Sequence, residues 1–418
     1  MKPTITIIGA GISGLTTAVY LHKKGYKIQI LEASERAGGR IKTDIVNGFR
    51  LDHGFQVLLT EYPEAKALLD YEKLNLKKFL PGATVLYDEG QFEIADPFRR
   101  PSLLFATLFA PVGSIKDKIN TFFLKNKLVN ISLLNLFKQP EIETLNKLHH
   151  YGFSEKMINR FYKPFFSGIF LENDLKTSSN MFDFVMKMFS EGDAAIPELG
   201  MEEIPKQLVQ LLPQEAIQYH LKVTSIENKT IYCENGQTFT TDKVVIATEA
   251  IGFASNYISK TKQKYHQVTN IYFETNLAPT TKAVVMLNAA TDKKWVNNLT
   301  VMSNVSEKYA PKGKVLISVS FNGISTDKDI TLAQNMKNEL KKWFGSQVED
   351  WMMLKCFRIN YALPNQDEVV NELEASQIKI NENLFICGDH LLNGSINAAM
   401  KTGRLVAESI IAQETQHL

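Results

Sequence analysis

The chain has 418 residues, enough for two domains or for one large domain with a second one inserted into it. Its 47 basic and 45 acidic residues leave a net charge of +2, and no long basic block could follow a nucleic-acid backbone, so we expect no nucleic-acid partner. The three cysteines, Cys233, Cys356 and Cys387, lie far apart and form no C-x-x-C pair. This spacing argues against a disulfide framework or a metal site and favours a reduced, cytoplasmic compartment, and the N-terminus shows no signal-peptide pattern.

The first 32 residues predict a β-α-β unit. Their apolar periodicity changes from strand-like to helix-like and back within about 30 residues. Thr4–Ile8 is the expected first strand, and the packed side of the following helix carries apolar residues at helical spacing. Gly25 ends that helix, and Lys27–Leu31 forms the second strand.

The turn between the first strand and the helix reads GAGISG, Gly9 to Gly14, and matches G-x-G-x-x-G in the context that a dinucleotide site requires. The glycine at 9 permits a tight turn, Gly11 lets the helix N-terminus approach a pyrophosphate, and Gly14 allows close packing of helix on sheet. Glu32 follows Gly11 by 21 residues and ends the second strand, where an acid accepts hydrogen bonds from ribose hydroxyls. The sequence therefore predicts a dinucleotide site, and both NAD and FAD fit this pattern.

Further strands and helices follow in an order that returns to the first sheet. Two short strands are expected around Asn47-Gly48, a dipeptide that readily supplies two positive φ angles. From about 96 to 212, long apolar and aromatic stretches without alternation predict helices. The remaining expected elements are a hairpin turned at Asn235-Gly236, strands at Lys243–Ala247, Ala283–Leu287 and Val315–Ser320, a helix at Leu332–Phe344, and a closing strand, loop and helix after 383.

This order predicts an α/β fold with a split Rossmann-type nucleotide-binding domain. A mixed α+β substrate domain that carries a helical subregion is inserted into it, because the chain leaves the nucleotide-binding sheet twice and returns twice. We expect residues 1–85, 205–264 and 375–418 to form the nucleotide-binding domain. Residues 86–204 and 265–374 then form the substrate-binding domain.

The stretch EASERAGGR, Glu32 to Arg40, resembles the E-x-x-x-x-x-G-G-R signature of the FAD-dependent amine oxidase, protoporphyrinogen oxidase and phytoene desaturase superfamily. The resemblance implies that the dinucleotide is FAD. We expect no covalent link, because Cys387 lies in a predicted strand and no other cysteine falls in a matching position. The resemblance places Glu32 on the adenosine ribose, the pair Gly38 and Gly39 close to the pyrophosphate, and Arg40 near the phosphates.

Three further segments carry the same resemblance. LDHGFQ is similar to the D-x-G loop that passes the isoalloxazine, LKVTSI with KVVIAT to a second adenine-side segment, and ICGDHLLNGSINAAMKTGR to the C-terminal loop and helix. In that last segment the resemblance puts Asp389 on a ribityl hydroxyl and the helix N-terminus at the pyrimidine end of the flavin. Asn397 stands where many amine oxidases have Glu, and Ala398 replaces a glycine. The cofactor-binding residues that the resemblance implies are Gly9, Gly11, Ile12, Ser13, Gly14, Glu32, Ala33, Gly38, Gly39, Arg40, Gly54, Phe55, Gln56, Val223, Ala247, Thr248, Gly388, Asp389, Ser395, Ile396 and Asn397.

The resemblance implies an FAD-dependent oxidoreductase, and two reactions remain open. One is amine-oxidase-like: hydride transfer to flavin from an apolar or amphiphilic small molecule, with oxygen or a quinone as acceptor. The other is desaturation or isomerisation of a polyene, or oxidation of a porphyrinogen, at a membrane surface. No second G-x-G-x-x-G precedes a helix, which favours electrons from the organic substrate over a separate NAD(P)H domain. No catalytic residue is assigned, because His53 and His390, beside the expected flavin loops, suit packing at least as well as catalysis.

The insertions bear on the substrate and on the membrane. Their Phe-, Leu- and Met-rich stretches suit either a helical core or an adaptable apolar cavity. The apolar run Leu103–Val112 is too short to span a bilayer. The segment 115–128 alternates apolar and Lys residues as a basic amphipathic helix does, and both a lid over the site and a helix on the inner face of the membrane fit it. The oligomeric state stays open.

Overall fold

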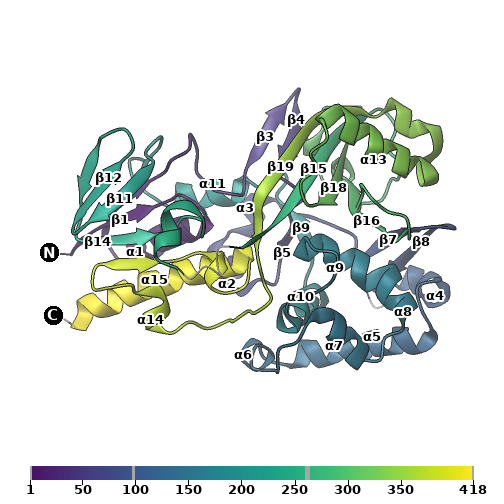
Figure 1. Cartoon of the computed structure of the whole chain (residues 1–418), viewed down its shortest axis with the longest axis horizontal. Coiled ribbons are helices and arrows are strands. Elements are labelled where there is room, and N and C mark those ends of the chain that lie inside the picture. The colour runs from purple at the N-terminus through teal and green to yellow at the C-terminus, as the bar shows by residue number, and fades with distance from the viewer. Residues whose placement is uncertain (1, 97–98, 259–263, 417–418) are drawn as a thin grey trace.

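A parallel five-stranded sheet of order β10-β2-β1-β14-β20 carries the N-terminal β-α-β unit. The computed structural model describes residues 2–96, 99–258 and 264–416 (Figure 1). The predicted strands Thr4–Ile8 and Lys27–Leu31 are confirmed. The strand predicted at Lys243–Ala247 is also confirmed and ends one residue earlier, at Ile246. The strands of this sheet are β1 (Thr4–Ile8), β2 (Lys27–Leu31), β10 (Ile217–Gln218), β14 (Lys243–Ile246) and β20 (Leu384–Ile386).

Two helices from opposite ends of the chain lie side by side against this sheet (Figure 1). They are α1 (Ile12–Lys23) and α15 (Ile396–Gln416). Their backbones approach so closely that a Cβ on Gly403 would lie 2.4 Å from the Ser13 carbonyl oxygen. The predicted packed side of α1 is buried, so periodicity located this helix correctly.

A mixed seven-stranded sheet of order β19-β15-β18-β17-β16-β7-β8 forms the second part of the fold. The pair β7 and β16 is parallel, and the other neighbours run antiparallel. The predicted helix at Leu332–Phe344 is confirmed as α13 (Asp329–Phe344), which packs on one face of this sheet through a core of its own. The strands are β7 (Gly82–Tyr87), β8 (Gly90–Ala95), β15 (Tyr265–Thr275), β16 (Val285–Asn288), β17 (Asn298–Val301), β18 (Val315–Asn322) and β19 (Met352–Pro364).

The described part of the predicted helical stretch, 96 and 99–212, consists mainly of helices joined by loops, and it contains one strand. Its helices are α4 (Leu104–Phe109), α5 (Ile115–Asn130), α6 (Leu133–Leu136), α7 (Thr144–His150), α8 (Glu155–Met157), α9 (Lys163–Phe170), α10 (Ser179–Glu191) and α11 (Glu203–Gln210). The strand is β9 (Ala194–Ile196), which pairs with β5 (Leu58–Leu59) and β6 (Lys77–Lys78). Three residues are too few to display a period, so tertiary pairing decides the conformation of this strand.

Short elements complete the chain. The turn predicted at Asn47-Gly48 is confirmed, with φ of 50° and 83°. The boundary expected after residue 85 falls inside β7, which pairs along its whole length in the seven-stranded sheet, and the rest of the division into domains stays a prediction. The short elements are β3 (Thr43–Val46), β4 (Phe49–Asp52), α2 (Pro63–Leu68), α3 (Tyr71–Leu74), β11 (Val223–Glu227), β12 (Thr230–Cys233), β13 (Thr238–Thr240), α12 (Met302–Val305) and α14 (Ala375–Ile378).

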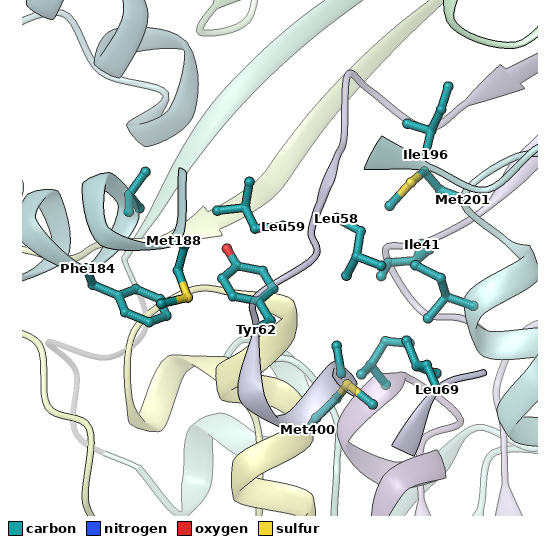
Figure 2. Packing of buried hydrophobic residues seen from close by; sticks show 14 of the residues in the cluster. Ile41, Leu58, Leu59, Tyr62, Leu69, Phe184, Met188, Ile196, Met201 and Met400 are labelled. Carbon is teal, nitrogen blue, oxygen red and sulfur yellow. The ribbon is translucent and has the colours of Figure 1, made fainter. Parts of the chain in front are cut away.

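One hydrophobic core continues from the parallel sheet into the helical region. Figure 2 shows part of it: Leu59 and Tyr62 lie beside Phe184 and Met188 of α10, and Met400 of α15 lies close by. The rings of Tyr62 and Phe184 stack with centroids 5.8 Å apart. Because apolar burial stabilises all of these segments together, the helices have a fixed position relative to the nucleotide-binding unit.

Asp52, a buried carboxyl at the end of β4, connects the nucleotide-binding unit to the seven-stranded sheet. Its Oδ1 accepts hydrogen bonds from Thr43 Oγ1 at 2.6 Å and from the Met201 backbone N–H at 3.0 Å, and its Oδ2 accepts one from the Tyr309 hydroxyl at 2.8 Å. The hydroxyl of Tyr272 in β15 donates to the Asp52 carbonyl oxygen at 3.0 Å. Burial raises the pKa of Asp52 from 3.8 to about 6 in spite of these donors.

Asp52 makes stability depend on pH. Between pH 3.8 and about 6 the folded protein keeps a proton that the unfolded chain has lost, so stability falls as pH rises through this window. The effect is on the order of 3 kcal/mol, from 1.36 kcal/mol for each pKa unit. An Asp52→Asn variant can keep both Oδ1 contacts and donate to Tyr309. In thermal scans, we expect the melting temperature of the variant minus that of the wild type to increase from pH 4 to pH 6. Parallel curves would contradict the assignment.

Candidate functional site

Two glycine loops pack backbone to backbone at the carboxyl ends of β1 and β2. Gly11 and Gly38 form an isolated parallel bridge, and the Gly38 N–H donates to the Ala10 carbonyl oxygen at 2.9 Å. A Cβ on Gly39 would lie 3.2 Å from the Gly11 Cα. At Gly38 φ is 124°, which L side chains rarely adopt. The stretch EASERAGGR thus folds directly onto the G-x-G-x-x-G turn.

Glu32 fixes the position of both loops. Its Oε2 accepts a hydrogen bond from the Ala10 N–H at 2.6 Å, and its Oε1 accepts from the Ser34 N–H at 2.9 Å and from Ser34 Oγ at 2.8 Å. The side chain is nearly buried and lines the cavity described below. The carboxylate therefore organises the turn from the position where a ribose contact is predicted.

The N-terminus of α1 has the features of an anion site. Its N-cap, Gly11, supplies no side-chain hydrogen bond, so the first N–H groups of the helix lack that partner. A Cβ on Gly11 would meet nothing within 4 Å, because this glycine faces open space. Free N–H groups and the positive end of the helix dipole favour a phosphate at this place.

Arg40 joins the N-terminal glycine loops to the C-terminal part of the chain. Its Nη2 donates to Asp389 Oδ1, and its Nη1 donates to the Ala362 carbonyl oxygen at 3.2 Å. The guanidinium also lies 5.8 Å from the ring centre of Tyr265. The arginine predicted at the phosphates and the acid predicted at the ribityl chain are therefore ion-paired with each other.

Both loops line one cavity of about 1520 Å³, which extends into the helical region. Pockets for drug-sized ligands typically measure about 300–1,000 Å³, so this cavity has room for a dinucleotide and a second molecule. The structure brings nineteen of the predicted residues to its wall, namely Gly9, Gly11, Ile12, Ser13, Glu32, Ala33, Gly38, Gly39, Arg40, Gly54, Phe55, Gln56, Val223, Ala247, Thr248, Gly388, Asp389, Ser395 and Ile396.

Two predicted residues lie behind the wall. A Cβ on Gly14 would be 2.2 Å from the Gly9 carbonyl oxygen, so Gly14 serves the close packing that the motif predicts. The buried side chain of Asn397 is turned away from the cavity, because its Oδ1 accepts a hydrogen bond from the Glu64 N–H at the start of α2. Its side chain therefore caps α2. The contact of the helix N-terminus at Asn397 with the flavin stays a prediction.

Several wall residues were not predicted. Glu249 follows Thr248 directly, and burial raises the pKa of its carboxyl. The Tyr265 hydroxyl accepts a hydrogen bond from the Ala250 N–H at 3.1 Å and thereby fixes the loop after β14. Tyr361 lines the cavity, and its ring centroid lies 5.8 Å from that of Tyr265, which is not itself a wall residue. The position of Glu249 next to a predicted residue was a usable signal.

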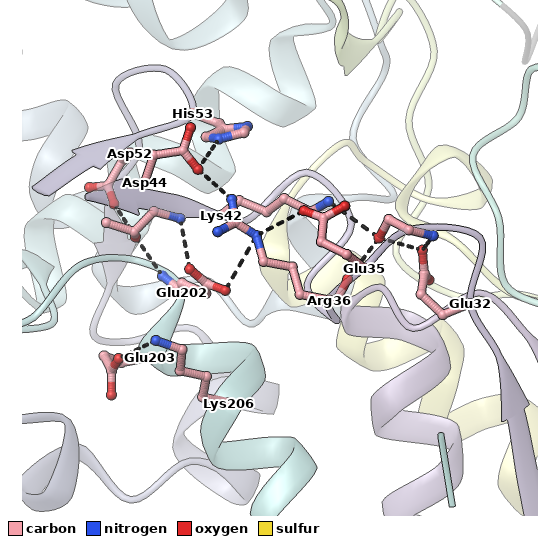
Figure 3. A network of polar contacts seen from close by, with 12 residues as sticks. Glu32, Glu35, Arg36, Lys42, Asp44, Asp52, His53, Glu202, Glu203 and Lys206 are labelled. Carbon is pink, nitrogen blue, oxygen red and sulfur yellow. Dashed lines mark hydrogen bonds and ion pairs between the residues drawn. The ribbon is translucent and has the colours of Figure 1, made fainter. Parts of the chain in front are cut away.

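His53 lies on the cavity wall within a network of charges (Figure 3). Its Nε2 is 3.1 Å from Asp44 Oδ1, and its ring packs against Phe357 with centroids 4.7 Å apart. Asp44 also pairs with Arg36 and Lys355. Burial lowers the pKa of His53 although Asp44 raises it, so the imidazole is neutral at pH 7. Packing and pairing fix this ring, while His390 is buried and does not line the cavity.

The comparison with known protein families matches residues 12–411 to the family described as flavin containing amine oxidoreductase. The match extends over nearly the whole chain. The chain belongs to the flavin containing amine oxidoreductase family. The relatives named below include the enzyme types that the sequence resemblance predicted, so that prediction is confirmed.

Individual relatives match over shorter stretches. Protoporphyrinogen oxidase 2 of Arabidopsis thaliana is 34% identical over 77 residues, which are 18% of this chain and 15% of the relative. A 1-hydroxycarotenoid 3,4-desaturase of a Flavobacterium species is 23% identical over 258 residues, 53% of this chain and 50% of the relative. Cyclohexylamine oxidase from Brevibacterium oxydans has the same fold, with a TM-score of 0.71 at 14% identity over 100% of both chains. This likeness confirms the predicted fold class.

As a member of this flavoprotein family the chain is an FAD-dependent oxidoreductase, and its residues fit the cofactor. The uncapped helix end, the open space before Gly11 and the backbone contact of the glycine loops suit a pyrophosphate. Cys233, Cys356 and Cys387 do not line the cavity, which fits non-covalent binding. Within the described part of the chain, no cluster of three or more His, Cys, Asp or Glu side chains is placed to hold a metal ion.

Substitutions at Gly11 and Gly14 can test cofactor binding and folding stability separately. We expect Gly11→Ala to keep the melting temperature of the FAD-free protein, because its φ of −74° suits alanine and its Cβ meets no protein atom. That Cβ projects toward the phosphate site, so FAD should be retained at least tenfold more weakly. Gly14→Ala should instead lower the melting temperature, since its Cβ clashes with the Gly9 carbonyl oxygen, and overpacking costs about 1–3 kcal/mol. Thermal scans and flavin absorbance after desalting measure both effects. Equal behaviour of the two variants would contradict this division of roles.

Proposed function

We propose that the protein oxidises an apolar or amphiphilic organic molecule that lies in the outer part of the cavity. The observation that supports this proposal is the continuity of one cavity from the glycine loops to an apolar wall in the helical region. The bound flavin supplies the hydride acceptor, and oxygen or a quinone is the proposed final acceptor. The protein's own residues then have three tasks: to hold the cofactor, to orient the substrate and to exclude water.

The nucleotide half of the cavity would hold FAD through its backbone. In this proposal the first N–H groups of α1 bind the pyrophosphate, and Glu32 contacts the adenosine ribose from its place beside Ala10. Asp389, fixed by Arg40, stands where a ribityl hydroxyl would be bound. Ser395 and Ile396, at the start of α15, line the same cavity. The reactive ring would thereby be placed at the junction with the substrate half.

The outer half of the cavity is lined by aromatic and flexible apolar side chains. The ring of Phe165 lies 5.7 Å from that of Phe161 and 5.3 Å from that of Phe189, so three rings form one wall. Met181 and Met186 of α10 add unbranched side chains that adapt to irregular ligands. Such a wall excludes water and binds an apolar chain or ring system.

Charges in the outer half favour a substrate that is uncharged where it reacts. The two acidic residues there are already paired, Asp96 with Lys125 and Asp193 with Arg99 and Lys78. Neither carboxylate is therefore available alone to balance an ammonium group. This observation favours the second candidate function, dehydrogenation of a polyene-type hydrocarbon, over oxidation of a small charged amine. An amphiphilic amine that binds as the free base also fits.

A neutral polar position interrupts the apolar wall. Asn298 and Ser320, on neighbouring strands of the second sheet, both line the cavity, and Ser320 Oγ donates to Asn298 Oδ1 at 2.7 Å. Gln56 lines the cavity near the glycine loops. These side chains could orient one oxygen or nitrogen atom of an amphiphilic substrate without a charge.

Substrate class can be tested by anaerobic bleaching of the flavin band. We expect long-chain amines or polyenes in detergent to bleach FAD-loaded protein, and small charged amines to leave it unchanged. A Phe165→Ala variant should lower kcat/KM about 10- to 100-fold, because a buried Phe side chain contributes about 1.5–3 kcal/mol. Phe239→Ala is the matched control, since Phe239 is also half-buried but lies in β13 away from the cavity.

Two results would argue against the proposed substrate class. One is bleaching by small charged amines alone, which an apolar half without a free carboxylate does not explain. The other is an equal loss of activity in the Phe165 and Phe239 variants, which would indicate general destabilisation.

A further inference from the structure

Helices α4 and α5 lie at the end of the molecule opposite the two termini (Figure 1). Both helices carry large apolar side chains that are exposed to solvent. We name this apolar surface the α4–α5 face. Its exposed fractions reach 71% for Phe105, 77% for Phe109 and 63% for Phe123. The face consists of Leu104, Phe105, Leu108, Phe109, Ile115, Ile119, Phe122 and Phe123. Monomeric proteins in water rarely leave so many large apolar side chains together on the surface, so this face indicates an interaction site.

The same two helices form part of the cavity wall. Thr107 of α4 and Lys118, Thr121 and Lys125 of α5 line the cavity. Phe122 both lines the cavity and is exposed, so the mouth of the cavity adjoins the α4–α5 face. Lys118 Nζ donates to the Ala110 carbonyl oxygen at 3.1 Å, which connects α5 to the end of α4. An apolar molecule could therefore pass from this face into the cavity without crossing bulk water.

The charge around the face is positive. Residues 99–127 contain six basic residues and one acidic residue, Asp117, and two of the basic residues, Arg99 and Lys125, pair with Asp193 and Asp96 outside this segment. Asp117 is buried, and its carboxylate accepts hydrogen bonds from the N–H groups of Ser114 at 2.6 Å and Ser154 at 2.7 Å. Lys116 and Lys127 are exposed. Basic groups beside a row of apolar side chains are the pattern of helices that lie in the surface of an anionic bilayer.

We propose that the α4–α5 face docks on an anionic lipid bilayer and that substrate enters the cavity from the lipid. This inference rests on the proposed function, since only an apolar substrate would be concentrated there. A second copy of the chain is a poorer occupant, because a symmetric contact would bring the basic groups of both copies together. Among residues 2–96, 99–258 and 264–416, no helix combines the length and apolarity needed to span a membrane, so docking would be peripheral.

Vesicle sedimentation of the full-length, FAD-loaded protein tests this proposal. We expect binding to vesicles of phosphatidylcholine with phosphatidylglycerol, weaker binding to phosphatidylcholine alone, and a decrease with added salt. The triple variant Phe105→Ser, Phe109→Ser and Phe123→Ser should bind at least tenfold more weakly. Leu277→Ser with Ile330→Ser is the matched control, because these residues are 66% and 78% exposed elsewhere. The five substituted residues do not line the cavity, so flavin content should be equal in all proteins.

Three outcomes would overturn the proposal. The wild type could stay in the supernatant with anionic vesicles, or the control could lose as much binding as the triple variant. Alternatively, light scattering could show a dimer that the triple variant converts to a monomer, which would assign the face to a second copy. Sedimentation needs no turnover, so vesicle binding without substrate oxidation would count against the proposed substrate and not against docking.

Discussion

Close backbone contact between the loops after β1 and β2 determines where the rest of the site lies. Gly11 and Gly38 form a bridge, and a Cβ on Gly39 would make a tight contact of 3.2 Å with the Gly11 Cα. The contact puts the helix N-terminus, Glu32 and Arg40 within one cavity wall. The acid predicted for a ribose and the glycines predicted for a phosphate follow each other closely in sequence, because the second loop folds back over the first. The short separation in sequence therefore reflects one binding surface.

The second constraint joins the ends of the chain. Arg40 and Asp389 are 349 positions apart, and their ion pair forms only when β20 has joined the sheet beside β14. The packing of α15 on α1 has the same requirement, since Gly403 must approach Ser13. Both contacts are strongly non-local, so forming them costs loop-closure entropy that native contacts must offset. The continuous core around Tyr62 and Phe184 contributes to this offset because it joins the insertions to the nucleotide-binding unit.

Sequence reasoning predicted what is encoded locally. The β-α-β unit follows from a change of period, and the roles of Gly11 and Gly14 follow from their places in one motif. The side-chain direction of Asn397 could not be predicted, because its partner is a backbone N–H at Glu64, which the fold alone brings near. β9 could not be predicted either, since only pairing with β5 and β6 makes it a strand. For the outer cavity, composition indicated apolar helices but not which of their side chains face inward.

The cavity itself changes in character along its length, and this gradient limits where chemistry can occur. Its nucleotide end presents backbone groups and the acids Glu32 and Asp389, which suit a polar, charged cofactor. Its outer end presents aromatic rings and paired charges, which suit neither phosphates nor free ions. With FAD bound at the nucleotide end, as we propose, a substrate in the outer end would meet the flavin where the two ends of the cavity join. The apolar walls would exclude water from that place, and the flavin would supply the hydride acceptor.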